Sequence, residues 1–355
     1  MQIEGLFDVA PTQKSELNWN VNIPIEDRNW NIGLIVGPSG SGKSTIAQRL
    51  FTITDSPVWD EHQSVMDGFP ATMGIKEITA IISAVGFSSP PSWLRPFHVL
   101  STGEQFRVRV ARTIAEASKT IVIDEFTSVV DRTVAQIASA AIAKLIRKRN
   151  MQFVAVTCHE DVETWLQPDW IYRPDLRMFQ WRELQRFPPV QLKIIRVHHS
   201  AWAMFRQHHY LNTSLNHSAT CFVAFWNDRP VAFSAWITMY GRSGSLRPRR
   251  REHRTVVLPD FQGIGIGNRL SEYCASLWVA LGYRVFSTTS HPGMIQYRNH
   301  SLLWRMRRTT SMVSRDTGKK KQQNRSTLRM TGGFEFIGPG ADPIIANQLL
   351  GKSTS

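Results

Sequence analysis

The sequence predicts an α/β protein with two domains, each organised around a strand, a glycine-rich loop and a helix. One such segment lies at residues 32–50 and the other at 254–281. A length of 355 residues suits two domains, and a hydrophobic content of 42% can form a core in each. The charge is unevenly divided, since residues 1–190 carry a net −2 and residues 191–355 a net +16, which together make +14. A strongly basic second half indicates an anionic partner.

Cysteine usage and hydropathy restrict the compartment. Cys158, Cys221 and Cys274 lie far apart, so they form neither a metal-binding spacing nor a disulfide framework. This usage is typical of a reducing environment. No apolar run reaches the ~18 residues of a membrane span, and the first residues lack the basic and apolar regions of a signal peptide. We therefore expect a cytoplasmic protein without a membrane segment.

The first glycine loop, residues 37–45, fits the pattern G-x-x-x-x-G-K-[ST] at every position. An apolar run at 32–36 predicts a buried strand before it, and 44–50 predicts a helix after it. Glycines let successive backbone N–H groups face one anion, and the helix N-terminus adds its positive dipole end. Lys43 can reach the β- and γ-phosphates of a nucleotide, and the Ser44 hydroxyl can ligate Mg²⁺. The expected phosphate-binding residues are Gly37, Ser39, Gly40, Gly42, Lys43, Ser44 and Thr45.

Three further motifs follow in the first half. A Ser-Thr-Gly turn at 100–105 opens a predicted helix, and a buried strand at 153–157 precedes His159. Between them, an apolar strand ends at Asp124 and Glu125, which places two carboxylates beside the nucleotide. One acid suits Mg²⁺ held largely through water, and the next can polarise an attacking water.

These motifs, in this order, resemble those of the ABC ATPase superfamily over about residues 1–180. The resemblance implies that Asp124 supports Mg²⁺, that Glu125 activates water and that His159 contacts the γ-phosphate of ATP. It also implies that Ser101 and Gly103, in the signature motif, contact ATP bound to a second protomer. An ATP-dependent head-to-tail homodimer is therefore expected.

The sequence departs from the ABC pattern at the signature, where Thr102 and Glu104 stand in place of the usual Gly and Gln. Asp131 matches the D-loop acid of the family. The stretch between phosphate loop and signature is short, which predicts a small helical subdomain with little surface for a membrane permease. An ATPase without a permease partner is favoured over a transporter subunit.

Domain boundaries follow from composition. Paired prolines at 188–189 disfavour helix and stiffen a connector. We expect an ATPase domain at 1–185, a linker at 186–190, a second domain at 191–345 and a disordered tail at 346–355.

In the second half, a strand at 254–258 leads through a second glycine loop into a helix predicted over 268–281. The loop spacing, G-x-G-x-G, does not meet the dinucleotide fingerprint. The segment resembles motif A, (Q/R)-x-x-G-x-(G/A), of the GNAT acyltransferases. That resemblance implies a mixed-sheet α+β domain in which loop N–H groups bind the pyrophosphate of acetyl-CoA. The loop residues are Gln262, Gly263, Gly265, Gly267 and Asn268.

The GNAT resemblance covers about residues 191–345 and implies a splayed strand at 285–289. In many family members a Tyr near the position of Tyr297 protonates the departing CoA thiolate, although a core or surface Tyr is the alternative. The stretches 208–211 and 290–292, with His208, His209 and His291, resemble Mom-like phage enzymes, which modify adenine in DNA. Each His has an alternative role as a capping or core residue.

A basic segment lies at 304–329, which contains nine Lys and Arg residues and one acidic residue, Asp316. A hairpin or loop of this kind can follow a phosphate backbone, although a solvated loop is the alternative. The basic residues are Arg305, Arg307, Arg308, Arg315, Lys319, Lys320, Lys321, Arg325 and Arg329.

Three functions are compatible with these motifs. The first is an ATPase and N-acyltransferase that modifies a base amine in nucleic acid, DNA over RNA, after flipping or strand opening. The second is a nucleotide-regulated N-acetyltransferase for a protein or small amine. The third is a nucleic-acid clamp whose acyltransferase-like domain is inactive. The basic second half favours the two functions that involve nucleic acid over the acetyltransferase for a protein or small amine. Turnover of acyl-CoA would distinguish the nucleic-acid acyltransferase from the inactive clamp.

Overall fold

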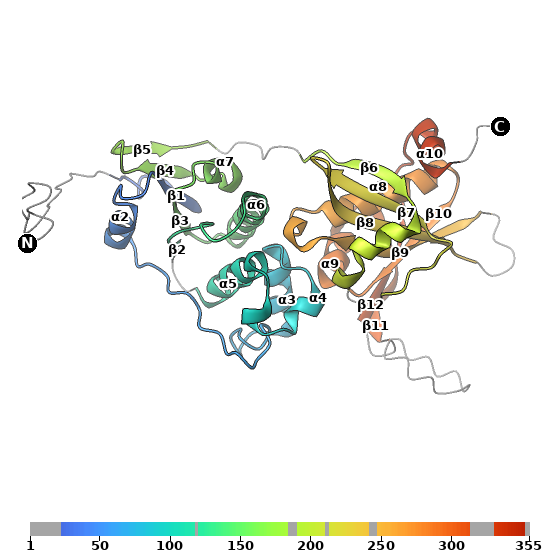
Figure 1. The fold of residues 1–355 in the computed structure, drawn as a ribbon, viewed down its shortest axis with the longest axis horizontal. Helices are drawn as coiled ribbons and strands as arrows, with labels where there is room; N and C mark the ends of the chain where they lie inside the picture. The colour runs from blue at the N-terminus through green and yellow to red at the C-terminus, as the bar shows by residue number, and fades with distance from the viewer. Residues whose placement is uncertain are drawn as a thin grey trace, which may run out of the picture.

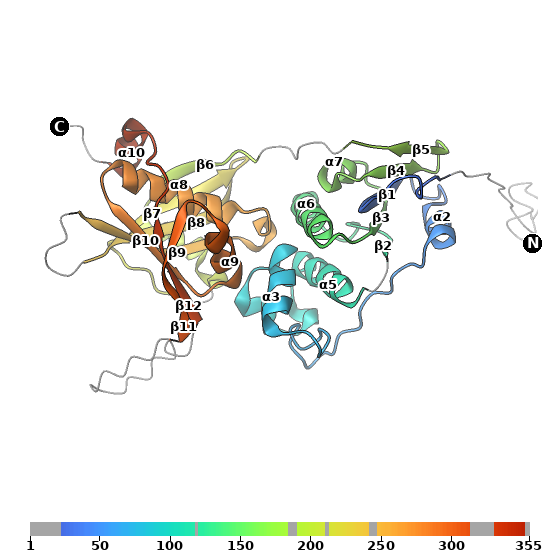
Figure 2. The same ribbon diagram turned by 180° about the vertical axis from the view of Figure 1, so that it is seen from behind.

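The computed structural model describes residues 23–117, 120–183, 190–209, 213–240, 247–312 and 330–351. Figure 1 shows two lobes along the long axis, each with its own sheet, and Figure 2 shows the same arrangement from behind. Several sequence predictions lie outside the described residues: the strands before residue 23, linker residues 186–189, Tyr210 with Leu211, and the basic residues between 313 and 329.

The first lobe contains a five-stranded sheet in the order β2-β3-β1-β4-β5. Strands β2, β3, β1 and β4 run parallel, and β5 pairs antiparallel with β4. Every residue of β1 is buried, as expected for the central strand of a covered parallel sheet. The strands are β1 (Ile32–Val36), β2 (Ile121–Ile123), β3 (Phe153–Thr157), β4 (Trp170–Arg173) and β5 (Met178–Trp181). The helices against this sheet are α2 (Lys43–Leu50), α6 (Arg132–Arg149) and α7 (Val162–Leu166).

The segment between α2 and β2 forms the small helical part that the short spacing predicts. Its helices are α3 (Ile75–Ala84), α4 (Pro90–Trp93), η1 (Phe97–Val99) and α5 (Thr102–Glu116). Helix α5 begins with a capping box, in which the Ser101 hydroxyl accepts from the Glu104 N–H and the Glu104 carboxylate accepts from the Ser101 N–H. Glu104, which departs from the ABC pattern, therefore closes the N-terminus of this helix.

The second lobe contains a seven-stranded sheet in the order β11-β12-β10-β9-β8-β7-β6, with only β9 and β10 parallel. The strands are β6 (Lys193–Val197), β7 (Thr220–Trp226), β8 (Arg229–Thr238), β9 (Arg249–Val257), β10 (Arg284–Thr289), β11 (Trp304–Met312) and β12 (Met330–Phe336). The helices are η2 (His199–Met204), η3 (Arg206–His208), η4 (Pro259–Phe261), α8 (Ile266–Ala280), α9 (Pro292–His300) and α10 (Pro343–Leu350). The predicted class, an α/β phosphate-loop domain followed by a mixed-sheet α+β domain, is confirmed by the two sheets.

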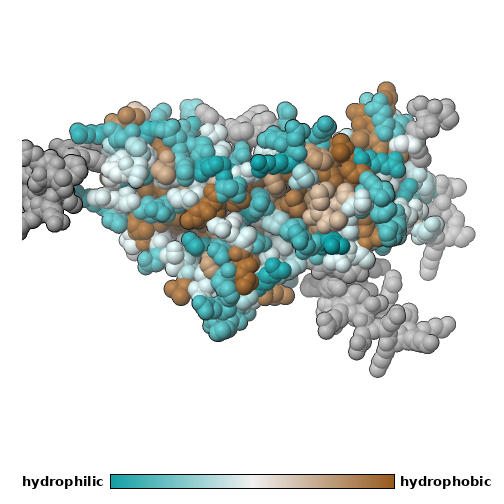
Figure 3. All heavy atoms as spheres, viewed as in Figure 1, coloured by the Kyte–Doolittle hydropathy of each residue, from teal (hydrophilic) through white to brown (hydrophobic). Residues whose placement is uncertain are grey.

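The prediction of a disordered tail from residue 346 is wrong, because α10 continues to Leu350. The Asp342 carboxylate accepts from the Ile344 N–H at 2.7 Å and caps the helix. Ala346 and Leu350 are buried in the core of the second lobe. On the face seen in Figure 3, apolar atoms lie over α10, where Ile344 and Ile345 are exposed.

Among the described residues, none of the helices combines the length and the apolar character that crossing a membrane requires.

Candidate functional site

The phosphate loop follows the central strand β1 and ends at the N-terminus of α2. Gly40 and Gly42 have φ of 79° and 85°, in the left-handed region that favours glycine. No atom lies within 4 Å of the position that a Cβ of Gly40 would take, so the loop is open on that side. The Lys43 ammonium donates to the Pro38 carbonyl at 2.7 Å, which holds it over the loop. Ser39, Ser44 and Thr45 are exposed, whereas Gly37 is buried.

The acidic pair and His159 reach the same edge of the sheet as this loop. Val36 of β1 pairs with Thr157 of β3, and Ile123 of β2 pairs with Ala155. Because these strands are parallel, their carboxyl ends meet at one edge. Asp124 and Glu125 therefore share that edge with the phosphate loop and with His159, as the motif order predicts.

Glu125 has a backbone conformation that is uncommon for a residue with a side chain. Its φ is 51°, and its side chain is exposed. The Glu125 N–H donates to the Asp124 carboxylate at 2.8 Å, which orients that acid. Asp131 accepts from the Thr133 and Val134 N–H groups, so it caps α6.

Asp175 is a residue near this site that sequence patterns do not reveal. A Cβ at Gly37 would meet the Asp175 carboxylate at 2.9 Å. Asp175 lies between β4 and β5, in a turn without a motif. Only the pairing of β4 with β1 brings that turn to the phosphate loop.

The signature turn contacts the second lobe. Ser101 is exposed, but Gly103 is buried, and a Cβ there would lie 3.2 Å from Val134 and 3.7 Å from the Asp260 carboxylate. One turn further along α5, Arg107 is 1% exposed and donates to the carbonyls of Pro259 and Asp260 at 2.5 and 2.8 Å. Burial lowers the pKa of Arg107 to about 10, so the guanidinium stays charged at neutral pH. The two hydrogen bonds of Arg107 connect α5 to η4.

The second glycine loop combines an open cradle with contacts between the lobes. Gly265 precedes α8 with φ of 91°, and no atom lies within 4 Å of its would-be Cβ. A Cβ on Gly263 would lie only 2.7 Å from the Gly86 Cα and 3.2 Å from the Ala141 Cβ. The Gln262 side chain accepts from the Ser88 N–H at 2.8 Å and donates to the Val257 carbonyl at 2.9 Å. Gln262 and Gly263 therefore hold the lobes together, and the loop is open at Gly265.

A cavity of about 780 Å³ adjoins this loop. Residues Arg249–Arg251 of β9 pair with Arg284–Phe286 of β10. Beyond these residues the two strands no longer pair and separate. This gap confirms the expected splay, and the cavity extends into it. Its lining includes Gly263, Gly265, Gly267, Asn268, Thr288, Tyr297, His208, His209 and His291, together with Ser83, Ser88, Pro90, Lys144 and Lys148 of the first lobe.

The Tyr297 hydroxyl donates to the Glu272 carboxylate at 2.9 Å. Burial raises the pKa of Tyr297 first, and the hydrogen bond to Glu272 raises it further. The phenol is therefore protonated at neutral pH. The Tyr297 side chain lines the cavity, and its hydrogen bond to Glu272 of α8 sets its orientation.

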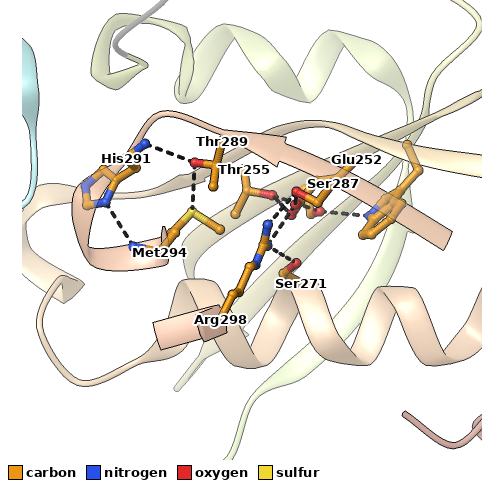
Figure 4. Close-up of polar contacts among 10 residues, drawn as sticks. Glu252, Thr255, Ser271, Ser287, Thr289, His291, Met294 and Arg298 are labelled. Atoms are coloured by element: carbon orange, nitrogen blue, oxygen red, sulfur yellow. Dashed lines mark hydrogen bonds and ion pairs between the residues drawn. The ribbon is translucent and has the colours of Figure 1, made fainter. Parts of the chain in front are cut away.

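His291 has the capping role that the sequence leaves open for it. Its Nδ1 accepts from the Met294 N–H at the start of α9 (Figure 4). Its Nε2 lies 2.9 Å from the Ser88 carbonyl of the first lobe. Burial lowers the pKa of His291, which favours the neutral ring. The ring therefore joins α9 to the first lobe.

A buried ion pair forms the floor of the splay (Figure 4). Arg298 on α9 is fully buried and lies 2.9 Å from the Glu252 carboxylate on β9. Ser287 donates to Glu252 at 2.5 Å, Thr255 donates to it at 2.6 Å, and Arg298 also donates to Ser271 at 2.8 Å. Burial would raise the pKa of Glu252, but the Arg298 charge and these hydrogen bonds outweigh it and lower that pKa. The network fixes α9, and Tyr297 with it, against β9, β10 and α8.

The fold and the two cradles define a phosphate-loop domain joined to a mixed-sheet domain with a second glycine loop at a helix N-terminus. Residues 159–296, less than half of the chain, match the model of the acetyltransferase (GNAT) family. No curated protein matches the chain. The matched residues include the second glycine loop and end at residue 296, immediately before Tyr297.

Several solved structures resemble part of the chain, among them three from ABC proteins. A dimeric ATP-binding cassette in a post-hydrolysis state with ADP and Pi shares 17% identity, with a TM-score of 0.35 over 48% of this chain and 90% of that one. The structure of cbiO1 from Clostridium perfringens, part of an ABC transporter complex, shares 16% identity with this chain. Its TM-score is 0.34, over 44% of this chain and 76% of that one. A dimeric bacterial ABC transporter cassette shares 15% identity, with a TM-score of 0.33 over 49% of this chain and 90% of that one. These values are too low to support a functional inference.

Proposed function

We propose that this protein is an ATP-hydrolysing ABC-type ATPase joined to a GNAT-type N-acyltransferase that uses acetyl-CoA and modifies nucleic acid, DNA over RNA. The observation that carries the acyltransferase part is the open cradle at Gly265, which faces a cavity of about 780 Å³ in the splay between β9 and β10. A cradle of backbone N–H groups at a helix N-terminus suits the pyrophosphate of a CoA thioester.

In the ATPase domain, the loop N–H groups and Lys43 would hold the phosphates of ATP, and Ser44 and Asp124 would hold Mg²⁺. Mg²⁺, when bound, neutralises charge on the phosphates. Glu125 orients and polarises the attacking water, and His159 contacts the γ-phosphate. Ser101, exposed at the N-terminus of α5, and Gly103 contact ATP of a second protomer in a head-to-tail dimer. The present burial of Gly103 requires α5 to shift relative to η4 when that dimer forms.

In the acyltransferase domain, an amine nitrogen attacks the thioester carbonyl carbon. The carbon–sulfur bond breaks, and the CoA thiolate takes the proton of Tyr297. The proton that the amine loses passes to solvent water, and the Tyr297 phenolate takes a proton back from solvent before the next turnover. A phenol that stays protonated at neutral pH suits this role, and the Glu272 carboxylate orients it.

Replacing Tyr297 by Phe keeps the ring and removes the proton donor. We expect acyl transfer to slow by about 10²-fold with little change in the affinity for acetyl-CoA. Steady-state kinetics together with binding by calorimetry measures both. Tyr273→Phe is the matched control, because it removes a phenol from α8 that does not line the cavity. An unchanged turnover number for Tyr297→Phe would assign Tyr297 a structural role.

Gly265→Asp tests the cradle. A side chain there places bulk and negative charge where the phosphates bind, so acetyl-CoA binding should disappear while ATP hydrolysis persists. Calorimetry with acetyl-CoA measures the first and phosphate release the second. Gly282→Asp is the matched control, because Gly282 also has a positive φ, 81°, and open space but lies at the other end of α8. Binding that survives in Gly265→Asp would place the donor elsewhere.

The net charge of +16 on residues 191–355 favours nucleic acid as the acceptor over a protein or small amine. Lys319, Lys320 and Lys321, outside the described residues, are proposed to contact phosphates. The narrower relation to Mom-like enzymes stays a prediction. The alternative is a nucleic-acid clamp with an inactive acyltransferase domain. Mass spectrometry of nucleosides from cells that express the wild type or Gly265→Asp distinguishes these functions, because only an active acyltransferase produces a modified nucleoside that the variant lacks.

Replacing Lys319, Lys320 and Lys321 by Ala should weaken duplex DNA binding and flatten its salt dependence. Each phosphate contact contributes about −0.9 to the slope of log K against log salt. Fluorescence anisotropy across a salt series measures the change. A triple control, Arg49, Lys76 and Arg149 to Ala, removes the same charge from exposed positions of the first lobe. Equal slopes for both triple variants would assign the lysine run to a solvated loop.

A further inference from the structure

One face of the ATPase helix α6 docks on the acyltransferase domain. Ile137 is 1% exposed and belongs to the hydrophobic core of the second lobe. Ala141, one turn later, contacts Gly263 of the second glycine loop. Lys144 and Lys148 follow at spacings of three and four residues, so they continue the same face of the helix. Both lysines line the cavity of about 780 Å³ that contains the open cradle.

The cavity therefore has two anion-binding walls from different domains. The acyltransferase wall offers Gly265, Gly267 and the N-terminus of α8, where backbone N–H groups can face an anion. The ATPase wall offers two ammonium groups, and within the described ranges neither forms an ion pair. Lysines in the last turn of a helix complement its dipole, but Lys144 precedes that turn.

We propose that Lys144 and Lys148 of the ATPase domain bind phosphate groups of the acyl-CoA donor, so that the donor site is shared between the two domains. This inference rests on the proposed acyl-CoA donor. Coenzyme A carries a pyrophosphate and a 3′-phosphate, more negative charge than one glycine cradle can neutralise. An ammonium on a flexible stem is a suitable point charge for such groups. The ATPase domain then determines part of the donor specificity.

The test uses the full chain with Lys144→Ala and Lys148→Ala combined. Calorimetry with CoA should show affinity on the order of tenfold lower than the wild type at low salt, and a smaller difference at high salt. The matched control is Lys76→Ala with Arg149→Ala, which removes two exposed charges from α3 and α6 that do not line the cavity. ATP hydrolysis should be equal in both variants, which verifies that the ATPase domain is folded.

The outcomes separate this inference from the donor proposal. If the wild type does not bind CoA, both are wrong. If the wild type binds CoA and the lysine variant binds it as the control does, the lysine role alone is wrong. Repeating the titration with 3′-dephospho-CoA locates the contact: an equal loss for both ligands supports the pyrophosphate, and a loss for CoA alone supports the 3′-phosphate. Weaker DNA binding with unchanged CoA affinity would overturn the inference.

Discussion

Glu125→Gln is expected to slow ATP hydrolysis by about 10²–10⁴-fold while ATP still binds. The exchange keeps the size of the side chain but removes the carboxylate that we propose polarises the attacking water. Glu125 adjoins Asp124 at the edge of the sheet that carries the phosphate loop, and its side chain is exposed toward solvent. The contacts of the loop and of Lys43 to the phosphates should persist, so the ATP-bound state accumulates.

That accumulation makes the proposed dimer measurable. Size-exclusion chromatography of Glu125→Gln with ATP and Mg²⁺ should show a species of twice the mass, which disappears when ATP is left out. Glu77→Gln is the control, because it neutralises an exposed carboxylate on α3 away from the phosphate loop. A monomer at every ATP concentration would count against the head-to-tail dimer, and full hydrolysis by Glu125→Gln would remove Glu125 from the mechanism.

Arg298→Met is expected to lower the free energy of unfolding by about 3–5 kcal/mol, because it leaves a buried carboxylate without its partner. Glu252 is 9% exposed, and Arg298 supplies its only cation among the described contacts. The guanidinium also lies over the Trp304 ring at 4.2 Å, and the variant loses that contact as well. Urea denaturation followed by circular dichroism measures the change.

The pH dependence should differ between the wild type and this variant. In the folded wild type the pKa of Glu252 is lowered, so its contribution to stability is present above the ordinary Glu pKa of about 4.3 and is lost as the pH falls through the folded value. Without Arg298, burial dominates and raises the pKa of Glu252. Arg298→Met should then gain stability as the pH falls from 7 toward 5, and the gap to the wild type should narrow.

The double variant Glu252→Gln with Arg298→Met is the control for the buried charge. It removes both ions, so we expect it to recover part of the stability that Arg298→Met loses. A double variant as unstable as the single one at pH 7 would show that lost packing, and not the unpaired carboxylate, is the main cost.

Local sequence patterns predicted the two cradles well because their physics is local. Gly42 and Gly265 are needed where φ is positive at the N-terminus of a helix, and both stand in short motifs that carry this requirement. The acidic pair was recognisable because an apolar run of strand length ends at Asp124. The same reasoning failed for α10, because its two buried residues, Ala346 and Leu350, become apolar anchors only when the core of the second lobe is present.

The order of the motifs and the glycines of both loops can therefore be read from short stretches of the amino-acid sequence. Tertiary structure alone decided which distant residues meet. Arg107 reaches the carbonyls of Pro259 and Asp260 across about 150 residues of chain, and Lys144 and Lys148 share a cavity with Gly265. No periodicity encodes such contacts, because they depend on how two separately formed surfaces pack, and a basic helix end looks the same in sequence whether it faces solvent or a cavity.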